Sequence, residues 1–313
     1  MIGLPLMVFA ITFIEWHMIG FSLAFSSSGS KFIGDFSNAL LRGVLEENIQ
    51  DASGDSGHIL VFRQAVLASA RYESRFSVLM LWCKLTQRSA VLVTGGTAER
   101  GRFSPFLIFI MLWNLLVYVP VVRWTWQTQG WLHELGVIDC AGGIVVHICA
   151  GTGSAAYSWA LGMRLGKRRN RPHNTALSTV GVIFFWVGTT ASIGSSTTSA
   201  TRAVIAVINA NLSACTGALL WSLIDAYRLG SWSLLSFNSG AVAGLVAISS
   251  GASFVPTWAS LLYGTVAGAV CYGATRLKHM IISIIELDDE FDMFALHVVG
   301  GAVGGILTAI FAT

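Results

Sequence analysis

The sequence predicts an all-α protein that crosses a membrane several times and forms a single domain over 1–313. Hydrophobic residues make up 54% of the 313 residues and charged residues only 11%, whereas about a quarter of an average soluble domain is charged. The mean hydropathy is +0.67. Several continuous apolar runs approach or exceed the roughly 20 residues that a helix needs to span a bilayer. A membrane barrel would need short alternating strands instead, and a soluble helical core is the alternative that this composition disfavours.

We expect nine helical spans that pack as one closely spaced bundle. Their approximate ranges are 2–25, 58–97 (interrupted), 104–124, 140–163, 177–198, 203–226, 238–255, 257–277 and 292–312. Glycine recurs at four-residue spacing in the last span, in the pairs Gly300/Gly304 and Gly301/Gly305. Small residues at this spacing allow helix backbones to approach closely where lipid supplies no hydrophobic force between helices.

The loop charges predict an orientation. The segment 164–173, "RLGKRRNRPH", holds five basic residues, whereas 34–57 is acidic. Since basic loops stay on the cytoplasmic side, we expect 164–173 inside the cell and 34–57 outside. Binding of anionic lipid or nucleic acid is the other reading of a basic loop, but a topology signal explains it sufficiently, and no nucleic-acid partner is expected.

One stretch interrupts the second span. Residues 71–88, "RYESRFSVLMLWCKLTQR", carry four basic residues and a glutamate, each of which costs a few kcal/mol at mid-membrane. Removing these 18 residues joins the flanking apolar segments into one span of about 20 residues, the usual length. We therefore interpret 71–88 as an insertion, best explained by a retained intron. A genuine insertion that forms an extramembrane hairpin is the alternative.

The sequence contains no signature of an enzyme, a metal site or a disulfide framework. Its five cysteines form no C-x-x-C pair, and most lie in apolar runs as small buried residues. Neither a phosphate-binding G-x-x-x-x-G-K-[ST] motif nor H-E-x-x-H occurs. No cofactor and no catalytic residue are predicted, and no cleavable signal peptide is visible at the start.

Two histidines are the strongest candidates for function. His147 and His297 each lie inside an apolar, glycine-rich helix, and each follows an acid: Asp139 is eight residues before the first, and Asp292 five before the second. These comparable segments lie five spans apart, in the fourth and ninth spans, which predicts an inverted repeat with its site between the halves. A neutral imidazole can donate from one nitrogen and accept at the other, so a facing pair can share a proton. A satisfied core residue is the alternative for either histidine alone.

Weaker candidates lie at the expected outer side. In "VRWTWQTQGW", Trp124 and Trp131 fit an aromatic belt at the membrane interface, and Trp126 is a candidate for cation–π recruitment. The hydroxyl-rich stretch 192–203, "SIGSSTTSATRA", is a solvated loop or a set of hydrogen-bonding groups for a cation. Asp139, near a helix start, is stabilised there by the free N–H groups.

Four segments resemble the ammonium transporter family, in particular its fungal members: "DCAGGIVVHICAG", "AVLVTGGTAERGR", "SGAVAGLVAISSG" and "DDEFDMFALHVVGGAVGGILTAIFA". The resemblance covers nearly the whole chain apart from 71–88. It implies a helical bundle of eleven spans with an inverted repeat, of which about nine match here, and a homotrimer with one narrow pore in each subunit.

The resemblance also assigns roles to individual residues. His147 and His297 match the twin histidines of the pore, while Asp139, Trp126 and Ser196 match the outer site that recruits the cation. Asp292 matches an acid before the second histidine, and Ser249 stands where bacterial members have threonine. The chain departs from the family at the two phenylalanines that close the pore, where Leu67 and Ser192 stand instead. The family's first and last helices and its tail have no counterpart in the chain.

The implied function is transport of ammonium or ammonia, with methylammonium as a second substrate, through a pore with a twin-histidine proton relay. The implied location is the plasma membrane, with the lipid bilayer as the surroundings. An ammonium sensor and an inactive product are the alternatives, the latter suggested by the unmatched ends, the charged insertion and the altered closing residues.

Overall fold

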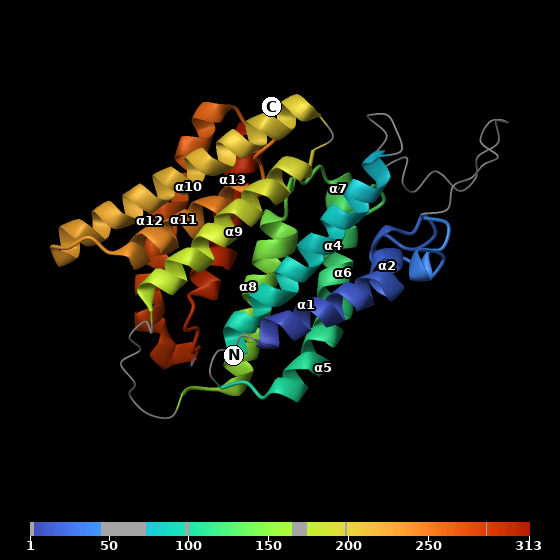
Figure 1. The fold of residues 1–313 in the computed structure, drawn as a ribbon, viewed down its shortest axis with the longest axis horizontal. Helices are drawn as coiled ribbons and strands as arrows, with labels where there is room; N and C mark the ends of the chain where they lie inside the picture. Colours follow the sequence, from blue (N-terminus) through green and yellow to red (C-terminus); the bar gives the residue numbers. More distant parts are fainter. Residues whose placement is uncertain (1–2, 45–72, 98–99, 165–173, 198, 286) are drawn as a thin grey trace. The chain divides into compact units, whose positions relative to one another are not determined.

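The structure is a computed structural model that describes residues 3–44, 73–97, 100–164, 174–197, 199–285 and 287–313. Within these ranges the regular elements are helices, apart from one isolated bridge between Gly29 and Gly34. The fold is shown in Figure 1. The chain divides into two compact units, unit 1 with residues 1–91 and 102–138, and unit 2 with residues 92–101 and 139–313.

The described part of unit 1 is helical. The helices are α1 (Gly3–Glu15), η1 (Trp16–Gly20), α2 (Phe21–Phe25), η2 (Ala39–Leu41), most of α4 (Glu73–Val93), α5 (Phe103–Trp113), η5 (Asn114–Tyr118), α6 (Val119–Trp126) and α7 (Trp131–Glu134). α1 packs against α5, and α2 packs against α6. The fully buried Arg123 of α6 donates from Nε to Ser30 O (2.7 Å) and from Nη1 to Ser26 O (3.0 Å). These bonds secure the loop after the first span to α6.

Unit 2 contains the remaining helices. They are η4 (Thr94–Thr97), η6 (Gly143–Ile148), α8 (Cys149–Leu161), α9 (Thr175–Ser195), α10 (Ala200–Leu229), α11 (Leu234–Ile248), α12 (Thr257–Ile285), η7 (Phe294–Val299) and α13 (Gly300–Phe311). α10, α11 and α12 pack side by side. Helix ends follow local rules: the Asn174 side chain accepts from Leu177 N at the start of α9, and α8 and α10 end at Gly162 and Gly230, both with positive φ.

Glycines allow the close helix packing in unit 2. A Cβ built on Gly244 would lie 2.2 Å from Ser213 O, and one on Gly304 would lie 2.1 Å from Ala247 O. Gly301 similarly faces Gly143 O at 2.6 Å, whereas Gly305 faces open space. The predicted role of small residues at helix contacts therefore applies to Gly301 and Gly304 but not to Gly305.

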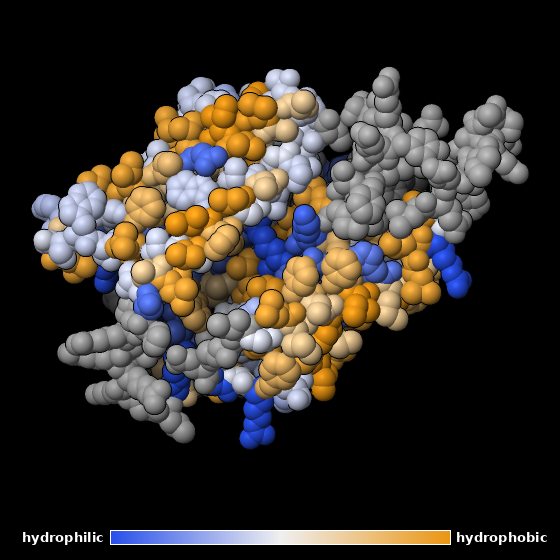
Figure 2. Space-filling model, viewed as in Figure 1, coloured by the Kyte–Doolittle hydropathy of each residue, from blue (hydrophilic) through white to orange (hydrophobic). Residues whose placement is uncertain are grey.

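Six helices in the described part of the chain are long and apolar enough to cross a membrane. They are Gly3–Phe25, Phe103–Glu134, Gly143–Leu161, Thr175–Ser195, Ala200–Leu229 and Phe294–Phe311. The expected spans at 238–255 and 257–277 correspond to the shorter α11 and to α12. Figure 2 shows apolar side chains over much of the visible surface. In α9, for instance, Phe184 and Val187 are exposed, as expected of a helix that faces lipid. The prediction of a polytopic helical membrane protein is confirmed.

The charged stretch 71–88 is described from residue 73 onward, where it forms most of α4. The side chains of Leu81, Cys83 and Leu85 are buried in this helix, so the described part is a packed helix and not a hairpin. Its interpretation as an insertion or retained intron concerns the transcript and stays a prediction. Leu67 lies outside the described residues.

Candidate functional site

The structure brings the two predicted histidines together. His147 Nδ1 lies 3.0 Å from His297 Nδ1, which is hydrogen-bonding distance. The rings are stacked with centroids 5.1 Å apart and planes 17° apart. Their side chains are 0% and 4% exposed. Since an Nδ1–Nδ1 contact needs one donor and one acceptor, the pair holds a single proton between its facing nitrogens.

Each histidine lies in a π-helical turn that continues into an α-helix. His147 is in η6, which leads into α8, and His297 is in η7, which leads into α13. π-Turns are rare and often accompany functional sites. The helices can approach because Gly151 has no side chain: a Cβ there would lie 3.0 Å from Val298 N and 3.1 Å from His297 Cβ. A glycine one turn beyond His147 therefore makes room for the second histidine.

Asp139 fixes the start of the first histidine helix. Its Oδ1 accepts from the backbone N–H groups of Gly142 (3.1 Å) and Gly143 (2.7 Å), and its Oδ2 accepts from Ile144 and Val145 (both 2.9 Å). Gly142 reaches the required left-handed conformation with φ 94°. Burial raises the pKa of Asp139 to about 6, while the four N–H donors act in the opposite direction. Both carboxylate oxygens therefore hold the start of the helix in place.

Asp289, and not Asp292, has the equivalent position before the second histidine. Asp289 Oδ1 accepts from Met293 N (2.9 Å), and Oδ2 accepts from Phe294 N (2.8 Å). Burial raises the pKa of Asp289, as it does for Asp139. Asp292 is bonded instead to Lys278 and has a positive φ of 53°. Asp292 therefore does not have the position before its histidine that Asp139 has, and its role as a pore or support residue stays a prediction. The spacing of eight residues, common to Asp139–His147 and Asp289–His297, is the signal that identifies Asp289 as the equivalent acid.

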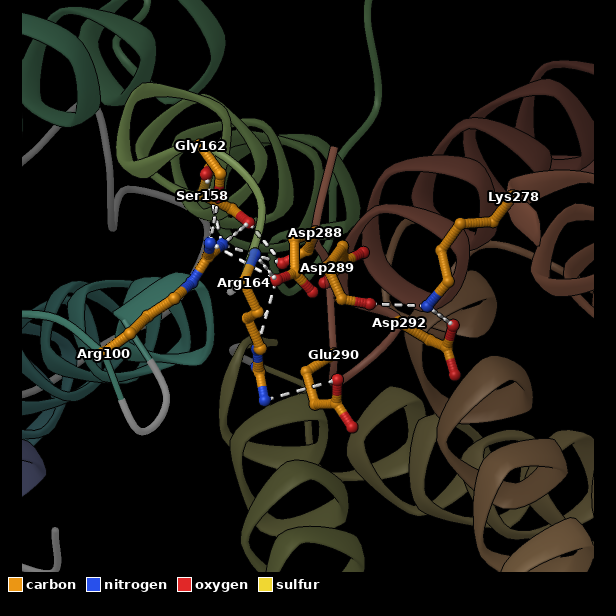
Figure 3. A network of polar contacts seen from close by, with 9 residues as sticks. All are labelled: Arg100, Ser158, Gly162, Arg164, Lys278, Asp288, Asp289, Glu290 and Asp292. Carbon is orange, nitrogen blue, oxygen red and sulfur yellow. Dashed lines mark hydrogen bonds and ion pairs between the residues drawn. The ribbon is translucent and has the colours of Figure 1, made fainter. Parts of the chain in front are cut away.

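An ion-pair network holds the segment that precedes η7 (Figure 3). Arg164 Nε lies 3.1 Å from Asp288 Oδ2, and Arg100 Nη1 lies 3.3 Å from the same oxygen. Lys278 Nζ donates to Asp289 O at 2.5 Å. Helix α8 joins the network, because Arg100 also donates to Ser158 Oγ (2.7 Å). Asp288 and Asp289 are thus bonded to three cationic side chains from different parts of unit 2.

The predicted serines have different surroundings. Ser196 Oγ donates to Ile193 O (2.7 Å) and lies 3.1 Å from Cys140 Sγ. Ser249 is fully buried, and its Oγ donates to Leu245 O within α11 (2.7 Å). Ser192 Oγ donates to Gly188 O (2.9 Å) on its own helix. Ser249 and Ser192 therefore satisfy their hydroxyls locally, whereas Ser196 lies beside the segment that Asp139 begins.

Trp126 lies in unit 1, whereas Asp139 and Ser196 lie in unit 2, so a recruitment site composed of all three stays a prediction. The Trp126 ring has its centroid 4.3 Å from that of Trp82. Trp124 and Trp131 pair with centroids 5.8 Å apart, as expected of aromatic residues that cluster at a helix end.

Two residues near the site were not singled out from the sequence. Cys140 is buried, and its Sγ lies 2.8 Å from Ser253 Oγ as well as near Ser196. Phe185 of α9 contacts both imidazoles, with ring centroids 6.5 Å from His147 and 6.4 Å from His297. Cys140 could have been noticed from its place directly after Asp139, but no sequence signal marks Phe185. Within the described residues, no cluster of three or more His, Cys, Asp or Glu could hold a metal ion.

Comparison with known proteins identifies the family. The family model described as Ammonium Transporter Family matches residues 1–313. The chain is 39% identical over 315 residues to ammonium transporter 1 of Schizosaccharomyces pombe, covering all of this chain and 59% of that protein. It is 35% identical over 317 residues to ammonium transporter MEP2 of Saccharomyces cerevisiae, covering 98% of this chain and 59% of that protein. The chain thus spans about three fifths of the length of these relatives.

The comparison with solved structures agrees with the family match. The crystal structure of Candida albicans Mep2 matches with a TM-score of 0.83 and 34% identity, over 98% of this chain and 64% of that one. Saccharomyces cerevisiae Mep2 matches with a TM-score of 0.84 and 34% identity, over 99% of this chain and 67% of that one. The predicted fold class and the resemblance noted in the sequence are confirmed, and the relatives bear the names of transporters, not enzymes. The chain belongs to the ammonium transporter family.

Proposed function

We propose that this chain forms the conducting part of an ammonium transporter, in which His147 and His297 relay a proton. The observation that carries the proposal is the 3.0 Å approach of two buried imidazole nitrogens. Membership of the family supports ammonium or ammonia as the substrate, because the relatives are named ammonium transporters. A buried pair of titratable groups inside apolar helices is expensive to maintain, which favours a functional role over a structural one.

The chemistry follows from the charge of the substrate. Ammonium carries a full charge, which is costly to move through an apolar interior. Ammonia is neutral, small and able to hydrogen-bond with either imidazole. The substrate therefore gives up its proton on one side to one imidazole, at the ring nitrogen that faces away from the pair, and moves past the pair as ammonia. The other imidazole releases a proton from its own outward nitrogen, and ammonia takes up this proton on the other side. The shared proton of His147 and His297 can shift between the rings as the substrate passes. Potassium has no proton to release and is excluded.

We extend the proposal to an outer site that recruits the cation, for which the resemblance to the family implies Trp126, Ser196 and Asp139. An aromatic face attracts a cation, and a serine hydroxyl can accept a hydrogen bond from it. The oxygens of Asp139 are already bonded to four backbone N–H groups. Asp139 therefore attracts the cation by its negative charge and not by a direct hydrogen bond. Asp289 has the corresponding helix-starting role before His297.

The proposal also covers the assembly, the membrane and the substrate range of the transporter. We expect a homotrimer in the plasma membrane with the basic loops in the cytoplasm, and methylammonium as a second substrate. The test is uptake of labelled methylammonium, together with growth on low ammonium, in cells that lack their own ammonium transporters. Uptake by the wild-type protein that is lost in His147→Ala or His297→Ala supports the proposal.

Two other outcomes select the alternatives. A signalling response to ammonium that persists in variants without uptake indicates a sensor. Absence of both uptake and signalling in a protein that is correctly inserted in the membrane indicates an inactive product.

A further inference from the structure

Phe185 lies against both members of the histidine pair. Its ring centroid is 6.5 Å from that of His147, with planes 62° apart, and 6.4 Å from that of His297, with planes 78° apart. Both arrangements are edge-to-face, a favourable geometry for aromatic rings. The nearly equal distances mean that one phenyl ring stands beside the two imidazoles together.

Phe185 lies on the face of α9 that packs into unit 2. Thr189, one turn after Phe185, and Ile193, one turn further, are both buried. Phe185 itself is partly buried and packs against the core of unit 2. The preceding residue, Phe184, is 73% exposed. Two adjacent phenylalanines on one helix therefore have different environments: Phe184 is exposed, whereas Phe185 packs against the core of unit 2.

The neighbouring positions on α9 are small and polar. Ser192 turns its hydroxyl back to Gly188 O, and Thr189 is a small buried side chain. Neither can fill the volume of an aromatic ring or exclude water as an apolar group does. Phe185 is thus the large apolar side chain that α9 places at the imidazoles.

We propose that Phe185 is the specificity-determining residue of the histidine site, where it keeps water and hydrated ions away from the imidazole pair. This inference rests on the proposed transport function and assigns selectivity to one side chain. A phenyl ring offers no hydrogen bond that could replace the hydration shell of an ion, whereas ammonia passes without such a shell. Removing the ring opens space beside two polar imidazoles, and a polar space of sufficient size holds water. Water beside the histidine pair lowers the free-energy barrier that an ion must cross to pass the two imidazoles.

The experiment compares Phe185→Ala, Phe185→Leu and the matched control Phe184→Ala. Each variant is reconstituted in lipid vesicles, in which methylammonium uptake and rubidium flux, as a substitute for potassium, are measured separately. Phe185→Ala is expected to raise the rubidium flux about tenfold or more while methylammonium still passes. Phe185→Leu, which restores most of the apolar volume, is expected to leak less than Phe185→Ala. Phe184→Ala is expected to match the wild type.

A second readout does not depend on transport. Diethylpyrocarbonate modifies accessible imidazoles, and mass spectrometry locates the modified residue. Faster modification of His147 and His297 in Phe185→Ala than in Phe184→Ala is expected, and Phe185→Leu extends the test if the alanine variant does not fold. Equal modification rates, or a rubidium flux that stays at the wild-type level in both Phe185 variants, overturn the inference. A wild-type protein without methylammonium uptake contradicts the proposed function instead, so the two failures are distinguishable.

Discussion

Asp139 and Asp289 have equivalent places in the fold. Each lies eight residues before a histidine, and each accepts hydrogen bonds from backbone N–H groups four and five residues later. Such bonds satisfy donors that a helix start otherwise leaves unpaired. The two carboxylates therefore set the position of both histidine helices by the same means, and the pair His147–His297 depends on residues that do not touch it.

Replacing Asp289 is expected to be far more damaging than replacing Asp292. Asp289→Ala removes two buried charge-assisted hydrogen bonds, a loss of roughly 1.5–3 kcal/mol for each bond to a charged group, and releases the start of η7. Asp292→Ala removes one ion pair with Lys278, which keeps its bond to Asp289 O. Thermal unfolding in detergent and methylammonium uptake measure the difference. Equal losses in the two variants would show that the position of Asp289 is unimportant.

Adding a methyl group at Gly151 is expected to separate the two histidines. A Cβ at this residue lies too close to Val298 N and His297 Cβ for the helices to keep their spacing, and overpacking of this kind typically costs about 1–3 kcal/mol. Gly151→Ala should therefore lower both the unfolding temperature and the uptake. Gly305→Ala is the matched control, because a Cβ there meets nothing within 4 Å. The account is wrong on this point if Gly151→Ala transports at the wild-type rate.

A buried pair in unit 1 gives a prediction about stability. Asn114 Nδ2 donates to Glu15 Oε2 (2.8 Å), and the two side chains are 0% and 6% exposed. The other oxygens, Glu15 Oε1 and Asn114 Oδ1, have no hydrogen-bond partner among the described residues. Asn114→Leu leaves the carboxyl group without its donor and should cost about 1–3 kcal/mol.

Glu15→Gln, in contrast, should be neutral or stabilising, because a glutamine amide supplies the N–H donor that Asn114 Oδ1 lacks. Unfolding temperatures of the two variants in the same detergent provide the check. A destabilisation by Glu15→Gln as large as that of Asn114→Leu would require the ionised carboxylate to be essential there.

Much of the fold and half of the site could be read from the sequence, because membrane spans and buried histidines leave strong local signals. Long apolar runs predict helices since no other open structure satisfies its backbone in lipid. His147 and His297 stand out because ionisable groups are rare in such runs. The equal spacing of Asp139 and Asp289 from their histidines is also present in the sequence, but the nearer acid, Asp292, competes with it as the acid before His297.

Other features depend on tertiary structure and have no local signal. Phe184 and Phe185 are identical residues next to each other, and only the rotation of α9 in the bundle determines which one faces the histidines. The contact of Cys140 with Ser253 joins positions 113 residues apart. In α4, the charged stretch after residue 72 has a buried face that its composition does not suggest.

The central claim is that His147 and His297 pass a proton between them, so that only a species able to release a proton is conducted. The most direct measurement compares methylammonium uptake and rubidium flux in vesicles that contain the wild type, His147→Ala or His297→Ala. The account predicts that the wild type conducts methylammonium and excludes rubidium, and that each substitution abolishes methylammonium uptake. Undiminished uptake in both variants, with rubidium still excluded, would contradict it.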